Sequence, residues 1–518
     1  MSEFDASAPL LHEIFALHGK WRKNRLAVIC EDEQLTWAEF SAAINQFGNA
    51  LHKRGIAPGA RVAILMDNGI PMAQALFGCM AAGCASVPLN LTVSDDAIAN
   101  MIRDAGASAV IVTPDQQARI DALTDSLSDA PLLLVTSGGA CAGWIGWDDF
   151  LSDSSKNLPD VAIADTDVLN IIYSSGTTGI PKGIVHTCRG RRDWAYDLAI
   201  ALRYHGAART LLTIGLYSNI SWVAMLCTLL GGGTLIIHRR FDAASFLASV
   251  ANEHVTHTAM VPIQFQRVIE LMQTGEFDVS SMQAMMSCGS PLHESLKREI
   301  FNKFPCGVIE LYGLTEGIIT TLDPEDAMGR WSSVGKPLQG TDIGILDNDD
   351  KPLPIGQSGE IISRGRITMP GYLNRPQASA EACWVDPQGN KWLRSGDIGR
   401  LDEDGFLYIV DRKKDMILSG GQNVYPQDIE AILIEHELIH DVAVIGVQSQ
   451  RWGETPIAIV VTGRAPADKN EIINWCNSRV GKQQRIADVL FAEELPRNPN
   501  GKVLKRELKK RFAGLNYP

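Results

Sequence analysis

The chain has 518 residues, with 47 Lys and Arg against 60 Asp and Glu, so its formal net charge is −13. This length is several times that of an ordinary domain, which excludes a small disulfide-stapled scaffold and predicts more than one domain. The acidic balance opposes broad attraction to nucleic acid or to an anionic membrane surface. We therefore expect small-molecule ligands and no nucleic-acid partner.

The cysteines and the first residues bear on the compartment. The 10 cysteines include no Cys-x-x-Cys pair, which argues against a zinc ribbon or a disulfide framework and fits a reducing environment. The segment from Met1 to Ala6 carries two acids and no basic region before an apolar run, unlike a secretory signal. These features predict a cytoplasmic protein.

Two uncharged stretches, residues 71–93 and 211–238, are long enough to suggest a membrane span. Pro88 and Asn90 interrupt the first, and Asn219 and three consecutive glycines interrupt the second. Each stretch is therefore predicted to form a buried helix, a turn and a strand, without stable membrane insertion.

In chain order, helical periodicity alternates with short β-branched runs. Residues 36–54 place Phe40, Ile44, Phe47 and Leu51 at helical spacing. Strands are predicted at residues 61–66, 108–113, 168–173, 234–238 and 256–261. This alternation predicts α/β layers with largely parallel sheets.

Beyond about residue 335 the pattern changes to short strands and glycine-rich turns, at residues 343–346, 359–363 and 405–410. Strands at 441–447 and 456–462 then alternate with helices at 427–435 and 469–480. The fold class is therefore predicted to be α/β. We expect a large N-terminal domain, residues 1–413, with parallel-rich αβ layers plus a small β subdomain, followed by a small mobile α+β C-terminal domain, residues 414–518.

One loop carries the clearest chemistry. Tyr173-Ser-Ser-Gly-Thr-Thr-Gly-Ile-Pro-Lys-Gly183 follows an apolar strand. Its glycines allow backbone amides to approach phosphate oxygens, its hydroxyls add donors, and Lys182 supplies charge. It is not a Walker loop, because no Gly-Lys pair in the chain is followed by Ser or Thr. The predicted polyphosphate ligands are Ser174, Ser175, Gly176, Thr177, Thr178, Gly179 and Lys182.

With this loop and the motifs that follow it, the sequence resembles the adenylate-forming enzymes, which include acyl-CoA and aryl-CoA synthetases, firefly luciferase and nonribosomal peptide adenylation domains. The resemblance covers nearly the whole chain. The further motifs stand in the family's order: Ser287-Cys-Gly-Ser-Pro-Leu292, Tyr312-Gly-Leu-Thr-Glu316, Arg394-Ser-Gly-Asp397, Asp411-Arg412, Ser419-Gly-Gly421 and Pro496-Arg-Asn-Pro-Asn-Gly-Lys502. The resemblance implies an AMP-forming acid:CoA ligase that uses ATP, Mg²⁺ and CoA.

The resemblance also implies roles for single residues. Thr315 and Glu316 would lie at the phosphates, with Glu316 binding Mg²⁺, and Lys502 would bridge the substrate carboxylate and the α-phosphate during adenylation. Asn500 is a departure, since the family more often has Thr there. The implied nucleotide contacts are Asp397 and Arg412 at the ribose, and Gly289, Ser290, Pro291, Tyr312 and Gly313 around the adenine.

Lys414 occupies the family's hinge position, about which the small domain rotates between adenylation and thioester formation. Rotation would bring Ser419, Gly420 and Gly421 to the pantetheine arm of CoA while Lys502 leaves the site. Glycines there suit close backbone contact, although a plain β-turn is the alternative.

The acid pocket is less clearly marked. Gly215-Leu-Tyr-Ser218 aligns with a family stretch that usually reads Pro-Leu-aromatic-His, so Ser218 replaces the His. The candidate lining residues, each of which could equally be ordinary core, are Tyr217, Ser218, Trp222, Gln264, Phe265, Cys288 and Ile318. Because residues 216–222 contain no carboxylate for an ammonium group, we expect a largely apolar acid with an uncharged tail, aryl or medium-chain, rather than an amino acid.

Some alternatives remain open. The basic cluster Arg189-Gly-Arg-Arg192 has either an ordinary structural role or a contact with CoA phosphates or an acidic substrate. The chain could be a stand-alone adenylation enzyme that loads a carrier protein, or a nonenzymatic nucleotide-binding protein, which the joint presence of Lys182, Glu316, Asp397 and Lys502 opposes. The expected partners are a small carboxylic acid, ATP and CoA, with homodimerisation left open.

Overall fold

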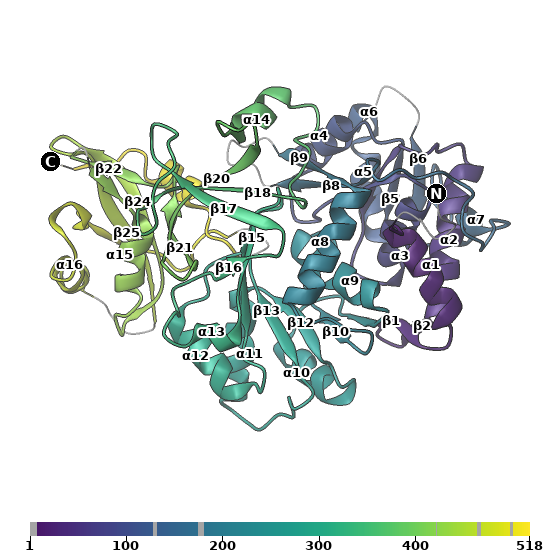
Figure 1. Cartoon of the computed structure of the whole chain (residues 1–518), viewed down its shortest axis with the longest axis horizontal. Helices are drawn as coiled ribbons and strands as arrows, with labels where there is room; N and C mark the ends of the chain where they lie inside the picture. Colours follow the sequence, from purple (N-terminus) through teal and green to yellow (C-terminus); the bar gives the residue numbers. More distant parts are fainter. Residues whose placement is uncertain are drawn as a thin grey trace. The chain divides into compact units, whose positions relative to one another are not determined.

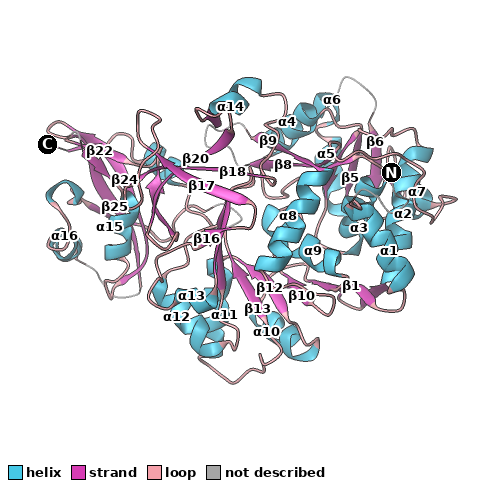
Figure 2. Cartoon of the chain, viewed as in Figure 1, coloured by secondary structure: helices cyan, strands magenta, loops and turns pink. Residues whose placement is uncertain are grey.

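The structure is a computed structural model that describes residues 8–127, 132–174, 181–420, 422–463, 468–497 and 501–517. It divides into two compact units, whose elements Figures 1 and 2 label. Unit 1 comprises Met1–Trp331, Pro337–Asp342 and Arg364–Leu393, and unit 2 comprises Ser332–Lys336, Ile343–Ser363 and Arg394–Pro518.

The first sheet of unit 1 has the strand order β7-β6-β5-β3-β4-β8-β9 within the described residues. Its neighbouring strands are parallel except for the antiparallel pair β8 and β9. The strands are β3 (Arg61–Leu65), β4 (Ala85–Pro88), β5 (Ala109–Val112), β6 (Leu133–Thr136), β7 (Ile145–Gly146), β8 (Val168–Ser174) and β9 (Lys182–Thr187).

The second sheet runs in the order β16-β15-β14-β13-β12-β10-β11-β1-β2. The strands from β14 to β1 are parallel, while β15 and β2 pair antiparallel with their neighbours β14 and β1. The strands are β1 (Leu26–Cys30), β2 (Glu33–Thr36), β10 (Arg209–Leu212), β11 (Thr234–Ile237), β12 (His257–Met260), β13 (Ala284–Ser287), β14 (Ile309–Gly313), β15 (Ile319–Leu322) and β16 (Lys336–Pro337). The prediction of parallel-rich layers is confirmed.

The helices of unit 1 connect these strands and cover both sheets. Two of them, α8 and α9, pack on each other, α8 against β8 and β9 and α9 against β10, β11 and β12. The helices are α1 (Leu11–Trp21), α2 (Trp37–Lys53), α3 (Ile70–Ala81), α4 (Asp95–Ala105), α5 (Gln117–Asp121), α6 (Thr124–Leu127), α7 (Trp147–Leu151), α8 (Cys188–Ala201), α9 (Asn219–Gly231), α10 (Ala243–Asn252), α11 (Pro262–Met272), α12 (Glu294–Lys303), α13 (Pro324–Ala327) and α14 (Pro376–Glu381).

Helix α2 shows why the local prediction succeeds. Thr36 and Glu39 form a capping box, in which the Glu39 amide donates to Thr36 Oγ1 at 3.3 Å and the Thr36 amide donates to Glu39 Oε2 at 2.8 Å. The predicted stripe of Phe40, Ile44, Phe47 and Leu51 is fully buried. Capping and periodicity therefore place this helix without help from distant residues.

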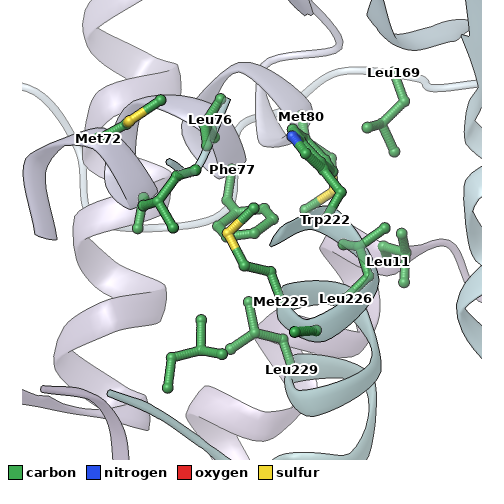
Figure 3. Packing of buried hydrophobic residues seen from close by; sticks show 14 of the residues in the cluster. Leu11, Met72, Leu76, Phe77, Met80, Leu169, Trp222, Met225, Leu226 and Leu229 are labelled. Atoms are coloured by element: carbon green, nitrogen blue, oxygen red, sulfur yellow. The ribbon is translucent and has the colours of Figure 1, made fainter. Parts of the chain in front are cut away.

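Helices α3 and α9 are apolar on all sides and are buried between the two sheets. The Trp222 and Phe77 ring centroids lie 5.9 Å apart, and Figure 3 shows both rings among Met80, Met225 and Leu226. These helices occupy the two uncharged stretches of the sequence. None of the described helices is long and apolar enough to cross a membrane.

Unit 2 begins with short strands, and the described part of its C-terminal block is an α+β sandwich. The strands of this first part are β17 (Thr341–Leu346), β18 (Gly359–Gly365), β20 (Lys391–Leu401) and β21 (Leu407–Arg412). Strand β19 (Cys383–Val385) pairs with the first residues of β20, which belong to unit 1. The sandwich sheet has the order β23-β22-β25-β24-β27, with β26 beside β25. Its elements are β22 (Ile417–Ser419), β23 (Gln422–Val424), α15 (Pro426–Leu433), β24 (Ile439–Ser449), β25 (Gly453–Thr462), α16 (Lys469–Asn477), β26 (Val489–Phe491), α17 (Lys505–Arg511) and β27 (Asn516–Tyr517).

Strand β25 is buried on both faces. Ala458 and Val460 join the cluster under α15 and α16, whereas Ile457 and Ile459 join the cluster under α17. The predicted strands and helices of this block are therefore confirmed. The predicted boundary between Lys413 and Lys414 lies inside unit 2, and a movement about it stays a prediction.

Candidate active site

The candidate residues of unit 1 follow the carboxyl ends of neighbouring parallel strands. Leu212, Ala259, Met286 and Ile309 are in register across β10, β12, β13 and β14. The carboxyl ends of parallel strands meet at one edge of a sheet, where α/β folds bind their ligands. The strand order therefore brings together four segments, namely residues 213–222, 261–265, 288–291 and 312–318.

The segment after β13 leaves the sheet through a left-handed glycine. Gly289 has φ +94°, a conformation that favours Gly. Cys288 before it is buried, and burial raises the pKa of its thiol to about 12. Gly289 and Pro291 are exposed and Ser290 is half-buried, so this loop can offer backbone to a ligand.

A tight turn between β14 and β15 carries Thr315 and Glu316. The Leu314 amide donates to the Ile318 carbonyl at 2.9 Å, and the Gly317 amide donates to the Leu314 carbonyl at 3.0 Å. Gly317 has φ +121°, and a Cβ atom there would lie 2.6 Å from Thr368 Cα. Only glycine fits that position, so the backbone conformation of the turn depends on Gly317.

Tyr372 connects Glu316 with Lys182. Its hydroxyl donates to Glu316 Oε1 at 2.9 Å, and the Lys182 ammonium lies 4.8 Å from its ring centroid. Burial, followed by the Glu316 charge, raises the pKa of Tyr372, so the phenol stays protonated and can donate. Tyr372 is not predictable from the sequence as a site residue, because a Gly-Tyr pair in a loop has no chemical signature of its own.

The phosphate loop is a hairpin connection. Ser174 at the end of β8 pairs with Lys182 at the start of β9, so the loop begins and ends at one place. The predicted ligands Ser175, Gly176, Thr177, Thr178 and Gly179 lie outside the described residues.

Two candidate pocket residues also maintain local structure. Ser218 caps α9 by accepting from the Ile220 amide at 3.3 Å. Gln264 accepts from the Val261 amide at 3.2 Å through Oε1 and donates to Thr213 Oγ1 at 3.2 Å through Nε2.

The other pocket candidates differ in burial. Trp222, Ile318 and Phe265 are fully buried, and Phe265 belongs to a core cluster with Met260 and Val268. Tyr217 is half-buried and covers Gly215, where a Cβ atom would lie 2.1 Å from the Tyr217 ring. Trp222 and Ile318 belong to core clusters as well, and Tyr217 is partly exposed, so a pocket role stays a prediction for each of these residues.

Tyr312 is half-buried and packs with Tyr372 against a small apolar cluster that includes Ile318 and Met369. Gly313 follows it, and a Cβ atom at Gly313 would lie 2.6 Å from the Ile318 carbonyl oxygen. The position after Tyr312 therefore requires glycine.

In unit 2, Asp397 and Arg412 face each other on the antiparallel strands β20 and β21. Arg412 Nε lies 3.3 Å from Asp397 Oδ1, and Asp397 is 4% exposed. Asp411 accepts from the Gln427 amide at 3.0 Å, which ties β21 to α15, and burial raises the pKa of Asp411 to about 6.

Lys502 belongs to the same group of charges in unit 2. Burial is the main reason that the pKa of Lys502 is lowered to about 7; Arg412 and Lys414 contribute to the lowering, and Asp397 and Asp415 oppose it. Lys414 lies in the turn after β21, and burial lowers its pKa as well. The predicted ribose ligands, hinge and catalytic Lys are therefore electrostatic neighbours.

The predicted pantetheine turn connects β22 and β23, where Ser419 pairs with Gln422. Gly420 has φ +58°, its amide donates to the Trp452 carbonyl at 2.8 Å, and a Cβ atom there would lie 2.8 Å from the Trp452 ring. Gly421 lies outside the described residues.

Comparison with known proteins identifies this arrangement. Residues 15–373 match the model of the AMP-binding enzyme family, and residues 428–502 match the AMP-binding enzyme C-terminal domain. The chain belongs to the AMP-binding enzyme family. Its relatives include the long-chain-fatty-acid–CoA ligase of Mycobacterium tuberculosis, 32% identical over 93% of this chain and 94% of that protein, and the feruloyl-CoA synthase of Amycolatopsis sp, 32% identical over 92% and 94%.

Solved structures agree with this assignment. The ATP-bound MatB of Rhodopseudomonas palustris has a TM-score of 0.86 at 25% identity, covering 97% of this chain and 99% of that one. The o-succinylbenzoate CoA synthetase of Bacillus subtilis, bound to its acyl-adenylate intermediate, has a TM-score of 0.84 at 27% identity, covering 96% and 97%. This AMP-binding enzyme is therefore an acid–thiol ligase of the acyl-CoA and aryl-CoA branch, with ATP and CoA as substrates, as the motifs predicted.

Proposed function

We propose that this AMP-binding enzyme activates a carboxylic acid in two steps. The carboxylate oxygen attacks the α-phosphorus of ATP and pyrophosphate leaves; the CoA thiolate then attacks the acyl carbon and AMP leaves. The observation that carries the proposal is that Tyr372 contacts two predicted phosphate-site residues: the Lys182 ammonium lies 4.8 Å from its ring centroid, and its hydroxyl donates to Glu316 at 2.9 Å. The Lys182 cation, together with Mg²⁺ held by Glu316, would offset the negative charge that develops on both sides of phosphorus.

The residues of unit 1 would bind the polyphosphate and the base. Lys182, Thr315 and the loop from Ser174 to Gly179 contact the phosphates, and Gly289, Ser290, Pro291, Tyr312 and Gly313 surround the adenine. The exposure of Gly289 and Pro291 supports this assignment. The candidates for the acid pocket remain Tyr217, Ser218, Trp222, Gln264, Phe265, Cys288 and Ile318.

Glu316 fits a magnesium ion that the nucleotide brings. The described residues contain no cluster of three or more His, Cys, Asp or Glu side chains that could hold a metal. Mg²⁺ commonly takes one or two carboxylates plus substrate phosphate oxygens. When bound, it would neutralise the phosphate charge, and Tyr372 would orient the Glu316 carboxylate toward it.

The residues of unit 2 would bind the ribose and act first in adenylation and then in thioester formation. Asp397 accepts from the ribose hydroxyls with Arg412 beside it, and Lys502 stabilises the adenylation transition state. Gly420 and Gly421 would then receive the pantetheine arm after rotation about Lys414. The closeness of Lys502 to Asp397 and Arg412 supports a shared nucleotide site.

The test separates this proposal from its rivals. Acid-dependent exchange of pyrophosphate into ATP, together with AMP release that requires free CoA, is expected. Exchange without any acceptance of CoA would favour loading of a carrier protein. Nucleotide binding without exchange, over acetate, octanoate, a cinnamate-type acid and phenylalanine, would overturn the enzymatic proposal.

A further inference from the structure

The basic cluster after the phosphate loop contains one arginine that is almost completely inaccessible. Arg191, on α8, is 1% exposed. Its Nε donates to Asn170 Oδ1 at 3.1 Å, and its Nη2 donates to Asn219 Oδ1 at 2.8 Å. The guanidinium also stacks over the rings of Trp194 at 4.6 Å and Trp222 at 5.5 Å. Arg191 therefore cannot be a surface contact for CoA phosphates.

This charge has no acidic counter-ion among the described residues. The carboxylates on the same helix bind other arginines, because Asp193 pairs with Arg192 at 3.1 Å and Asp197 pairs with Arg366. Burial lowers the pKa of Arg191 to about 9, so the group is still a cation at neutral pH. A buried and unbalanced cation is unfavourable unless an anion joins it.

A row of unsatisfied polar atoms lies against the same guanidinium. Ser86, Asn170 and His186 are register partners on β4, β8 and β9, so their side chains share one face of the sheet. Ser86 Oγ, Asn170 Nδ2, His186 Nε2 and Trp222 Nε1 are buried and have no hydrogen-bond partner in the described part of the chain. Buried polar atoms of this kind normally have a partner.

The unsatisfied atoms are mainly donors. An Asn amide nitrogen, an indole nitrogen and a guanidinium can only donate, while a Ser hydroxyl and a neutral imidazole can do either. Burial and Arg191 lower the pKa of His186, which keeps its ring neutral. The missing partner is therefore an acceptor, and the positive charge selects an anionic one.

The cluster also reaches the segment predicted to bind the acid. Asn219 and Trp222 lie directly after Ser218 at the start of α9. Trp222 contacts Phe77 with 5.9 Å between ring centroids, and it contacts Arg191 as well. Figure 3 shows its apolar neighbours Phe77, Met80 and Leu226. The tail of a ligand beside Trp222 would thus contact these apolar side chains and then the Arg191 guanidinium.

We propose that Arg191, with Asn170, His186 and Trp222, forms an anion subsite that binds a second, distal carboxylate of the acid substrate. The inference rests on the proposed ligase function and names the substrate class as dicarboxylic acids. It differs from the sequence-based expectation of an uncharged tail, which rests on residues 216–222. It takes up the alternative that the basic cluster, which lies on α8, contacts an acidic substrate.

The experiment compares straight-chain mono- and dicarboxylic acids of equal carbon number, from about six to ten carbons, as substrates for CoA-dependent AMP release. Charge-assisted hydrogen bonds contribute roughly 1.5–3 kcal/mol, so for one chain length kcat/KM should favour the diacid by about 10- to 100-fold. Arg191→Met keeps similar bulk without charge and should abolish that preference. Arg189→Met, on an exposed residue of the same helix, should leave it unchanged.

If Arg191→Met does not fold, ligand binding to the wild-type enzyme still tests the proposed anion subsite. In the presence of a non-hydrolysable ATP analogue, the preferred diacid should raise Tm more than its monoacid partner. A Tm that rises with chloride alone, without any diacid preference, would show that the cluster holds an inorganic anion and would overturn the proposal. Activation of monoacids in preference to diacids at every length would also overturn it, whereas activation of no acid at all would overturn the ligase proposal instead.

Discussion

The hydroxyl of Tyr372 donates a 2.9 Å hydrogen bond to Oε1 of Glu316, from a position 56 residues away in the sequence. The same ring lies under the Lys182 ammonium. Tyr372 is itself held by a hydrogen bond from its amide to Ser379 Oγ at 2.9 Å and by a bridge to Ile184 of β9. The carboxylate proposed to bind Mg²⁺ is therefore oriented by a side chain on a separate, well-anchored segment.

Tyr372→Phe should weaken the response to Mg²⁺. The variant keeps the ring under Lys182 and removes the hydroxyl, so Glu316 loses a donor at a cost of about 1–3 kcal/mol. We expect roughly a tenfold lower rate of pyrophosphate exchange and a higher Mg²⁺ concentration at half-maximal rate. Tyr408→Phe is the matched control, because that hydroxyl also donates to a carboxylate, at 3.1 Å from Asp402 Oδ2. An unchanged Mg²⁺ dependence in Tyr372→Phe would contradict the positioning role.

Gly317→Ala should disturb the turn that carries Glu316. The new Cβ atom would lie 2.6 Å from Thr368 Cα at a residue with φ +121°. Overpacking against backbone typically costs about 1–3 kcal/mol, so both Tm and the exchange rate should fall. Gly329→Ala is the control, since Gly329 also has a positive φ, +84°, but has nothing within 4 Å of the added atom. Equal effects of the two substitutions would show that crowding at Gly317 is not important.

Lys502→Ala should lose adenylation and keep thioester formation from preformed acyl-adenylate. Loss of a preorganised charged donor typically lowers the rate by about 10² to 10³. The two half-reactions are measured separately, by pyrophosphate exchange and by CoA consumption with synthetic adenylate. Similar damage to both half-reactions would refute a role confined to one step.

Lys502 should also make stability depend on pH. Its folded pKa of about 7 lies below the unfolded value of 10.5, so between these pH values the unfolded chain binds the extra proton. Stability therefore rises with pH across this window, and the penalty of the charged Lys is complete below about pH 7. Lys502→Met should raise Tm by roughly 1 to 4 °C near pH 7, with the difference shrinking toward pH 10. A difference between the two proteins that is constant from pH 7 to pH 10 would be incompatible with the lowered pKa.

Lys414→Pro should separate the two half-reactions in the opposite direction. Proline restricts φ to about −65°, so a rotation about this residue would be blocked. We expect adenylation to survive and thioester formation to fail, while Lys414→Ala, which leaves the backbone free, retains both. Loss of neither half-reaction in a folded Lys414→Pro variant would disprove the hinge.

Local interactions made much of the fold predictable. The Thr36 capping box, the apolar stripe of α2 and the β-branched strands of unit 1 depend on residues close in sequence. The motif order then identified the family, and the predicted ribose ligands Asp397 and Arg412 do face each other on adjacent strands. These features come from short-range periodicity, turn chemistry and motif spacing, which a sequence states directly.

What the sequence could not determine depends on strand order and burial. Tyr372 meets Glu316 only because its segment bridges β9 beside the β14–β15 turn. Phe265 is a predicted pocket residue, and only the structure shows that its side chain packs with Met260 and Val268. Arg191, in a run of basic residues typical of a solvated surface, is instead enclosed by α8, α9 and the face of β8. The solvation and pairing of a side chain are decided by neighbours far away in the chain, so only the tertiary structure shows which charge lacks a partner.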